Sequence, residues 1–266
     1  MNDLGSVKSG RLPTWGIQWR VIHALIMREI ITRFGRNNIG FLWLAVEPML
    51  FAIAIIAVRN LLHQTFHSVE IIPFFVIGYG NLLVWRFCAS RGMKAIEANR
   101  GLLHYRQIRI QDIFTARMLL EVAGVTVSFL FLWLIFALMG LMTWPSDPFI
   151  MVVGWLFACW FAASFGTFLG CLSELTGLVE RVWRPINYLS IIVSGVFFEV
   201  AWLPKGLQEW VLWVPLVHPM EMTRAGYWGD GSHWHYSMMF ITVACMTMTL
   251  LSGLLMRNRA LRDPHL

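Results

Sequence analysis

The chain alternates between long apolar runs and short polar, arginine-rich connections. A transmembrane helix needs about 20 predominantly apolar residues. The runs that meet or approach this length are residues 42–62, 71–89, 118–142, 149–172, 185–198 and 236–256. The pattern predicts an all-α integral membrane protein of about six transmembrane helices. A six-span core over residues 42–256 would then belong to a single domain that comprises residues 1–266.

The fifth run is the shortest, and a second apolar stretch over residues 200–217 follows it. Pro204, Gly206 and Pro215 divide that stretch into pieces that are too short to span a membrane. Charged residues in and beside it lie among tryptophans, as is typical of helices at a membrane interface. These are Glu199, Lys205, Glu209 and Glu221 among Trp202, Trp210 and Trp213. We therefore predict short re-entrant helices at the outer face rather than a seventh span.

The positively charged residues fall almost entirely on one side of this topology. Of the 21 Lys and Arg residues, all but Arg59, Lys205 and Arg224 lie on the side that holds both ends of the chain. Lys and Arg are enriched in cytoplasmic connections. The distribution predicts a multi-pass protein of the bacterial inner (cytoplasmic) membrane with both termini in the cytoplasm.

Composition agrees with a membrane location and argues against several classes of function. The hydrophobic fraction is 58% and the charged fraction 14%, whereas soluble domains carry about 25% charged residues. The sequence has no Gly-Lys dipeptide, no HExxH, no CxxC and no paired-acid motif in a predicted cytoplasmic connection. We expect no catalytic residue, metal or cofactor in this chain. The net charge of +6 is better matched by membrane lipid than by nucleic acid.

Residues 15–36 have apolar side chains at helical spacing, among them Val21, Ile22 and Leu25, with basic residues between them. This spacing predicts an amphipathic helix that lies on the cytoplasmic membrane surface. Such a helix either anchors the chain to lipid only or forms part of a docking surface for a cytoplasmic partner. The residues leave both interpretations open.

The longest predicted cytoplasmic connection covers residues 91–117. Helical spacing before Gly101, a break at that glycine, and the pair Gln111-Asp112 before the next apolar run predict a short helix, a turn and a new helix start. A solvated, positively charged loop is the simpler interpretation. A loop with a specific function is the alternative.

Ionisable and small residues within the apolar runs add two further expectations. Glu47 and Glu121 lie inside or near spans, where ionisable groups often have a function. Arg117 precedes Glu121 by four residues, so a simple structural ion pair is an equally good interpretation there. Gly166 and Gly170 form a GxxxG motif, which is typical of closely packed helices.

Aromatic residues gather near the predicted outer face. An interfacial belt is the simpler interpretation, and stacking on sugar rings along an exit path is the alternative. The residues concerned are Trp202, Trp210, Trp213, Tyr227, Trp228 and Trp234.

Three blocks of residues carry a resemblance to a known family, in the same order and over nearly the whole chain. They are residues 25–35 with 40–43 and Glu47-Pro48; residues 95–99 with 101–103, Tyr105-Arg106, Asp112 and 116–121; and residues 212–218 with Glu221, Arg224 and 226–228. The blocks resemble the permease subunits of type-2 ABC exporters, in particular the capsular-polysaccharide export branch. Val214 departs from the pattern, because many relatives of the wider family have Asn before the proline.

The resemblance implies six helices per subunit and a homodimer with the translocation path between its subunits. It also implies two copies of a separate ATPase subunit, which would hold ATP and Mg, and further periplasmic and outer-membrane export components. The cargo would be a lipid-linked capsular or related surface polysaccharide. The alternative is the same fold exporting O-antigen, teichoic acid or a small drug-like substrate.

The resemblance also assigns roles to residues by position. It places the cytoplasmic coupling region at residues 91–112. The residues assigned to coupling with the ATPase are Arg28, Glu29, Arg33, Glu97, Asn99, Arg100, Tyr105, Arg109 and Asp112. Those assigned to the translocation path or outer gate are Glu47, Trp213, His218, Glu221, Arg224, Tyr227 and Trp228.

Overall fold

The computed structural model describes residues 14–34, 50, 70–103, 108–229 and 234–262. Within those ranges every regular element is a helix, in agreement with the predicted fold class. The first predicted span, residues 42–62, lies outside the described residues except for Leu50. Glu47 and Tyr105 also lie outside them.

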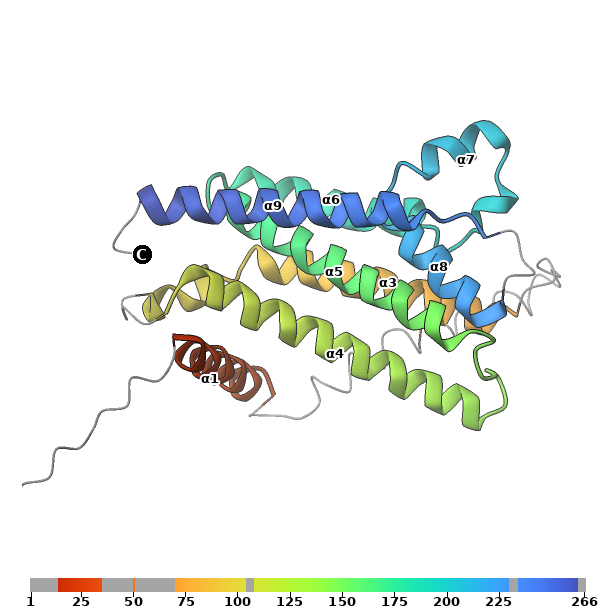
Figure 1. The fold of residues 1–266 in the computed structure, drawn as a ribbon, viewed down its shortest axis with the longest axis horizontal. Helices are drawn as coiled ribbons and strands as arrows, with labels where there is room; N and C mark the ends of the chain where they lie inside the picture. The colour runs from red at the N-terminus through yellow and green to blue at the C-terminus, as the bar shows by residue number, and fades with distance from the viewer. Residues whose placement is uncertain (1–13, 35–49, 51–69, 104–107, 230–233, 263–266) are drawn as a thin grey trace, which may run out of the picture.

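Four long helices form an elongated bundle, in which three run in one direction and α4 runs in the opposite direction (Figure 1). They are α3 (Ile71–Gly92), α4 (Ile110–Leu138), α5 (Pro148–Ser173) and α9 (Met238–Arg262). Among the described residues, these are the four helices that are long and apolar enough to cross a membrane, α9 through its stretch Met238–Arg257. The apolar runs at 71–89, 118–142, 149–172 and 236–256 therefore form helices, as predicted.

The helix α6 (Leu178–Val193) corrects the boundaries predicted for the fifth span, residues 185–198. Pro185, where the prediction began, lies inside the helix. The helix ends just before Gly195, whose φ of +86° is readily adopted only by glycine. Sixteen residues of helix extend about 24 Å, which is less than the ~30 Å hydrocarbon core. The total of six spans stays a prediction.

The start of α4 also differs from the prediction. The helix begins at Ile110, within the connection expected over residues 91–117. A carboxylate oxygen of Asp112 accepts a hydrogen bond from the backbone N–H of Arg109 at 3.0 Å, which satisfies one of the free donors at the helix start. Polar residues before the apolar run therefore extend the helix. A short helix is present near the expected place as the 3-10 helix η1 (Glu97–Leu102), but it continues through Gly101, so the break predicted at that glycine is wrong.

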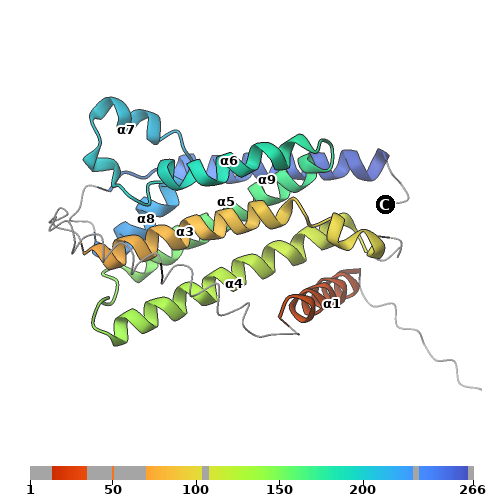
Figure 2. The same cartoon turned by 180° about the vertical axis from the view of Figure 1, so that it is seen from behind.

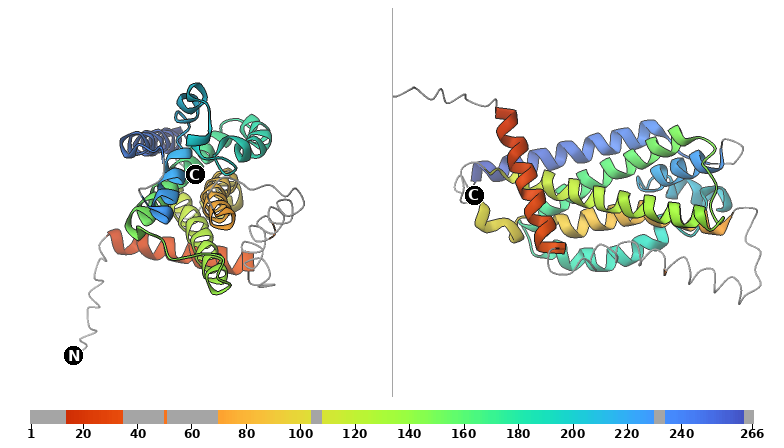
Figure 3. Two further views of the ribbon diagram at one scale, coloured as in Figure 1. Left: turned by 90° about the vertical axis from the view of Figure 1, so that its right-hand side faces the viewer. Right: turned by 90° about the horizontal axis from the view of Figure 1, so that it is seen from below.

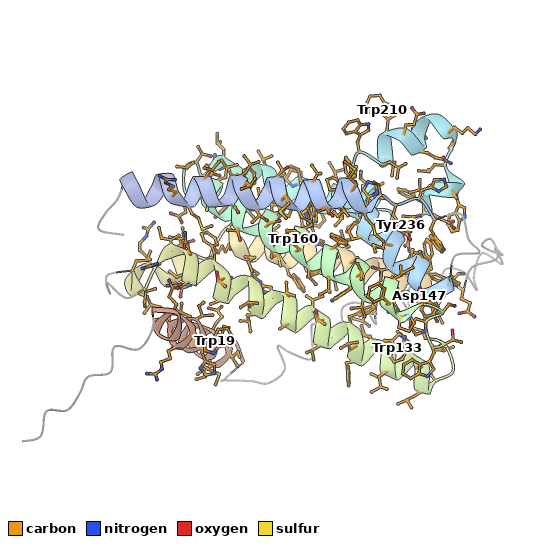
Figure 4. The ribbon with its side chains drawn as sticks, viewed as in Figure 1. Trp19, Trp133, Asp147, Trp160, Trp210 and Tyr236 are labelled. Atoms are coloured by element: carbon orange, nitrogen blue, oxygen red, sulfur yellow. The ribbon has the colours of Figure 1, made fainter. Side chains whose placement is uncertain are left out.

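The helix α1 (Thr14–Phe34) lies across one end of the bundle (Figure 3). Its buried Leu25, with Val21 and Ile22 beside it, packs into an apolar cluster that includes Ile113 and Phe114 of α4. The apolar face that the sequence predicted thus rests on the protein's own chain, so lipid anchoring does not account for this face. Other large side chains of α1 are exposed, among them Trp19 (Figure 4).

Three short helices connect α6 to α9 at the other end of the bundle (Figure 2). They are η2 (Val200–Trp202), α7 (Lys205–Val211) and α8 (Val217–Trp228). The first two match the short helices predicted over residues 200–217. The sequence did not predict α8, which is buried over nearly its whole length against α5 and α3. We call this the α7 end and the opposite end, where α1, η1 and the end of α9 lie, the α1 end.

The central helix α5 packs closely on α3 through the predicted GxxxG motif. A Cβ added at Gly170 would lie 2.6 Å from the carbonyl oxygen of Gly92. A Cβ added at Gly166 would meet the carbonyl oxygen of Cys88, which is backbone and cannot rotate away. The absence of side chains at these positions therefore sets the distance between α3 and α5.

Replacing Gly166 with alanine is expected to destabilise the bundle by about 1–3 kcal/mol, because overpacking forces two helices apart. The matched control is Gly253→Ala in α9, where an added Cβ meets no atom within 4 Å. That change is expected to be neutral or to stabilise the helix by up to about 1 kcal/mol. Apparent Tm values of the purified variants measure the difference, and equal Tm values for both would contradict the close packing.

Candidate functional site

Polar contacts join three elements at the α1 end. A guanidinium nitrogen of Arg28 in α1 donates a hydrogen bond to Oδ1 of Asn99 in η1 at 2.7 Å. Asn99 is buried, and its side-chain amide donates to the carbonyl oxygen of Ala95 at 2.8 Å. Two residues that were assigned to ATPase coupling therefore contact each other directly and connect α1 to the predicted coupling region.

A second connection runs from α1 to α4 through Arg117. Its guanidinium pairs with the carboxylate of Glu29, and its Nε lies 3.7 Å from Oε1 of Glu121. Arg117 and Glu121 are only 8% and 2% exposed. One buried cation thus lies between two carboxylates from different helices. The sequence predicted the pair of Arg117 with Glu121 but not the link to Glu29.

The other predicted coupling residues occupy different positions. Glu97 and Arg100 in η1 are exposed, and the guanidinium of Arg100 lies 3.9 Å from the carboxylate of Glu174. Asp112 is buried and fixes the start of α4 through the backbone of Arg109, whereas Arg109 itself is exposed. The side chain of Arg33 lies outside the described part of the chain, as does Tyr105. In η1, therefore, Glu97 and Arg100 are exposed, whereas Asn99 is buried and bonds to α1.

At the α7 end, Arg224 of α8 is fully buried. Its guanidinium donates hydrogen bonds to the carbonyl oxygens of Gly195 at 2.8 Å, Val196 at 3.1 Å and Phe198 at 3.2 Å. It also lies 3.6 Å from the centre of the Phe74 ring in α3, a cation–π distance. Arg224 therefore joins α8 to the segment after α6 and to α3.

Glu221 lies one helical turn before Arg224. Its Oε1 is 3.8 Å from the Arg224 guanidinium, and its Oε2 accepts a hydrogen bond from the backbone N–H of His235 at 3.3 Å. Burial raises the pKa of Glu221 to about 7, and the charge of Arg224 acts against this rise. Together, Glu221 and Arg224 connect α8 to the segments on both sides of it.

His218, in the first turn of α8, has both ring nitrogens in hydrogen bonds. Its Nε2 donates to the carbonyl oxygen of Leu212 at 2.8 Å, and its Nδ1 accepts from the backbone N–H of Ser237 at 3.1 Å. This pattern requires a neutral imidazole. Burial also lowers the pKa of His218. The ring therefore connects the end of α7 to the residues just before α9.

The aromatic residues that were assigned to the path have different exposures. The hydroxyl of Tyr227 is buried and accepts a hydrogen bond from the backbone N–H of Thr143 at 2.9 Å. Trp228 is partly buried and stacks on Trp234, with 5.6 Å between ring centres. Trp213 is 73% exposed. Four of the assigned residues, His218, Glu221, Arg224 and Tyr227, thus hold α8 in place, and their role in translocation stays a prediction.

Sequence reasoning missed the partners that complete both clusters. Glu29 and Arg117 are separated by 88 residues and Arg28 and Asn99 by 71, so no local spacing connects them. The hydrogen-bond partners of Arg224 are backbone carbonyl oxygens, and the identities of the side chains do not reveal where these oxygens will lie. The sequence around Arg224 is itself polar, so it offers no signal for these partners.

Comparisons with known proteins identify the family of this chain. Residues 20–228 match the model of the family described as ABC-2 type transporter. The capsule polysaccharide export inner-membrane protein CtrC of Neisseria meningitidis serogroup B is 38% identical over 244 residues, which cover 91% of this chain and 92% of that protein. BexB of Haemophilus influenzae, of the same description, is 35% identical over 91% of this chain and 92% of its own length.

A more distant relative is the polysialic acid transport protein KpsM of Escherichia coli. It is 28% identical over 236 residues, 85% of this chain and 90% of its own length. The family match extends from α1 to the end of α8, so it includes the buried charges around Arg117 and those around Arg224. The chain belongs to the ABC-2 type transporter family.

Proposed function

We propose that the chain is the membrane-spanning permease subunit of an ATP-driven exporter of capsular polysaccharide. The observation that carries this proposal is the similarity, at 35–38% identity over 91% of the chain, to inner-membrane proteins named for capsule polysaccharide export. Helices of membrane length and a large excess of apolar residues support a multi-pass location in the inner membrane. The lipid-linked state of the cargo is part of the proposal.

Hydrolysis of ATP belongs, in this proposal, to a separate ATPase subunit beneath the α1 end. Two copies of the ATPase would act on a homodimer of this chain, with periplasmic and outer-membrane components beyond it. The exposed charges of Glu97 and Arg100 on η1 support contact with such a partner. The first helix, α1, and the last turn of α9 lie at the same end of the bundle (Figure 1). This arrangement supports the proposal that both termini are in the cytoplasm.

The buried contacts at the α1 end suggest how motion would pass into the membrane. A push on η1 would reach α1 through the hydrogen bond between Asn99 and Arg28. It would reach α4 through the pair of Glu29 with Arg117. Because α4 continues from this cluster as one 29-residue helix, a tilt at its start would move the whole span.

The double substitution Glu97→Gln with Arg100→Gln is expected to reduce polysaccharide export at least about tenfold, if contacts of this kind contribute about 1.4 kcal/mol or more to productive coupling. ATP hydrolysis by the reconstituted complex is expected to continue. Lys94→Gln is the control, because Lys94 is an exposed cation three residues before η1. Capsule at the cell surface and hydrolysis by the purified complex are the two measurements, and full export by the double variant would contradict the coupling role of η1.

Copurification tests the function itself. The chain, expressed with the ATPase encoded beside it, is expected to form a stable complex that hydrolyses ATP. Deletion of its gene is expected to leave polysaccharide inside the cell. A purified chain that transports without any ATPase subunit would contradict the proposal. Export of O-antigen, teichoic acid or a small drug-like compound in place of capsule would keep the fold and change the cargo.

A further inference from the structure

A pocket of about 500 Å³ opens at the α7 end between α7, α8 and the start of α9. Its volume is within the range of about 300–1,000 Å³ that is usual for small-molecule sites. Four aromatic residues contribute to its walls: Trp213, Trp234, Tyr236 and Phe240. Figure 4 shows Tyr236 beside the start of α9, where this wall begins. None of these four residues is needed for the contacts of His218, Glu221, Arg224 and Tyr227 that hold α8 in place.

The aromatic rings are held in fixed positions. The ring of Phe240 meets Trp213 edge to face, with centres 6.1 Å apart, and lies 4.7 Å from the imidazole of His218. That imidazole is in turn fixed by its two hydrogen bonds. Trp213 nevertheless remains 73% exposed. The exposed ring of Trp213, packed against partly buried Phe240, offers a flat apolar surface of the kind that the C–H face of a sugar ring can stack on.

The pocket also has an accessible charged group. Glu209, an exposed carboxylate, lies on the α7 side of the same pocket. A lipid chain has no hydrogen-bond donor for this carboxylate, whereas sugar hydroxyls can donate to it.

We propose that this pocket is a saccharide-binding site, which takes one or two sugar rings by stacking on Trp213 and Phe240 and by hydrogen bonds from sugar hydroxyls to Glu209. The choice of polysaccharide as its ligand rests on the proposed function. The helices that line the pocket, α7, α8 and the start of α9, lie at the end of the bundle opposite α1 (Figure 1). With the α1 end in the cytoplasm, it would hold sugars of a chain that has already crossed the membrane.

The test measures binding without transport. The chain is labelled with 5-fluorotryptophan and placed in phospholipid nanodiscs, which keep glycoside detergents out of the pocket. The fluorine resonances of Trp213, Trp234 and Trp210 are assigned from the variants Trp213→Phe, Trp234→Phe and Trp210→Phe. Oligosaccharides released from the capsule of the producing strain are then added. Saturable shifts of the Trp213 and Trp234 resonances are expected, with no shift of Trp210.

Trp210 is a matched control, because it is a 76% exposed tryptophan on α7 that does not line the pocket (Figure 4). The double variant Trp213→Leu with Trp234→Leu is expected to bind the oligosaccharides about tenfold more weakly, as the loss of two aromatic contacts predicts. Trp210→Leu is expected to bind as the wild type does. Unchanged gel-filtration profiles and Tm values of the variants show that the fold is intact.

Three results would overturn the proposal: no shift of either pocket resonance, equal shifts of Trp210, or shifts that appear only when a periplasmic protein of the export system is added. The last would identify the pocket as a protein contact. Failure of the proposed function has a different signature. In that case the wild-type chain exports no capsule with its ATPase, and the binding measurement still gives its own answer.

Discussion

Replacing Arg224 with leucine is expected to lower the free energy of unfolding by about 3–5 kcal/mol, the range for removing one partner of a buried ion pair. The substitution leaves Glu221 buried without its cation. It also removes the donors for the carbonyl oxygens of Gly195, Val196 and Phe198. Much of the variant is expected to aggregate or be degraded, and fluorescence-detected gel filtration of membrane extracts measures the folded fraction.

Two further variants separate charge from geometry at this position. Arg224→Lys keeps the positive charge but has a single ammonium group in place of a planar fork of donors, so it cannot reach the same carbonyls. We expect its stability to lie between those of the wild type and the leucine variant. Lys205→Leu removes an exposed cation at the same end of the molecule and should change stability by less than about 0.5 kcal/mol. A leucine variant at position 224 as stable as this control would show that the buried contacts contribute little.

The sequence predicts well those elements in which hydrophobicity alone decides the structure. The runs that became α3, α4, α5 and α9 are long and apolar, and no polar alternative competes with a helix there. The close approach of α3 and α5 was also foreseeable, because two glycines four residues apart on one face of an apolar helix leave room for a neighbouring backbone. At the start of α4, Asp112 was recognised as a helix-start residue, although the helix begins earlier than the apolar run.

The missed elements are those in which tertiary contacts override the local pattern. The segment that forms α8 contains Glu221, Arg224 and His218 and has no apolar run, yet it is buried because its polar groups bond to neighbouring backbone. Likewise Pro185 was taken as a helix start, although it lies within α6. The sequence pattern shows which side chains are apolar. It does not show that the carbonyl oxygens of Gly195, Val196 and Phe198, just after α6, will accept hydrogen bonds from Arg224.

The same limit accounts for the outcome at the predicted coupling site. Proximity of Arg28 to Asn99 depends on where α1 crosses the bundle, and no spacing in the sequence encodes that crossing. The crossing itself follows from the packing of Leu25 against α4. Residues chosen by family resemblance therefore proved to be neighbours for a reason that became visible only in the fold.

Replacing Arg117 with methionine is expected to lower the free energy of unfolding by about 3–5 kcal/mol, because it leaves carboxylates in a buried site without their cation. Glu121 is 2% exposed and cannot reach water, and Glu29 loses its partner on α4. The cost lies in the uncompensated charge rather than in the lost volume, since methionine fills much of the same space. Apparent Tm values in detergent measure the loss.

Adding Glu121→Gln to Arg117→Met is expected to recover most of that stability, because removing both partners of a buried pair is far less costly than removing one. Export should not recover with it. The double variant still lacks the ion pair that joins α1 to α4, so the ATPase would continue to hydrolyse ATP while little polysaccharide reaches the surface. Recovery of both stability and export would mean that Arg117 serves packing only. Recovery of stability alone would identify the pair of Glu29 with Arg117 as the connection through which force passes into the membrane.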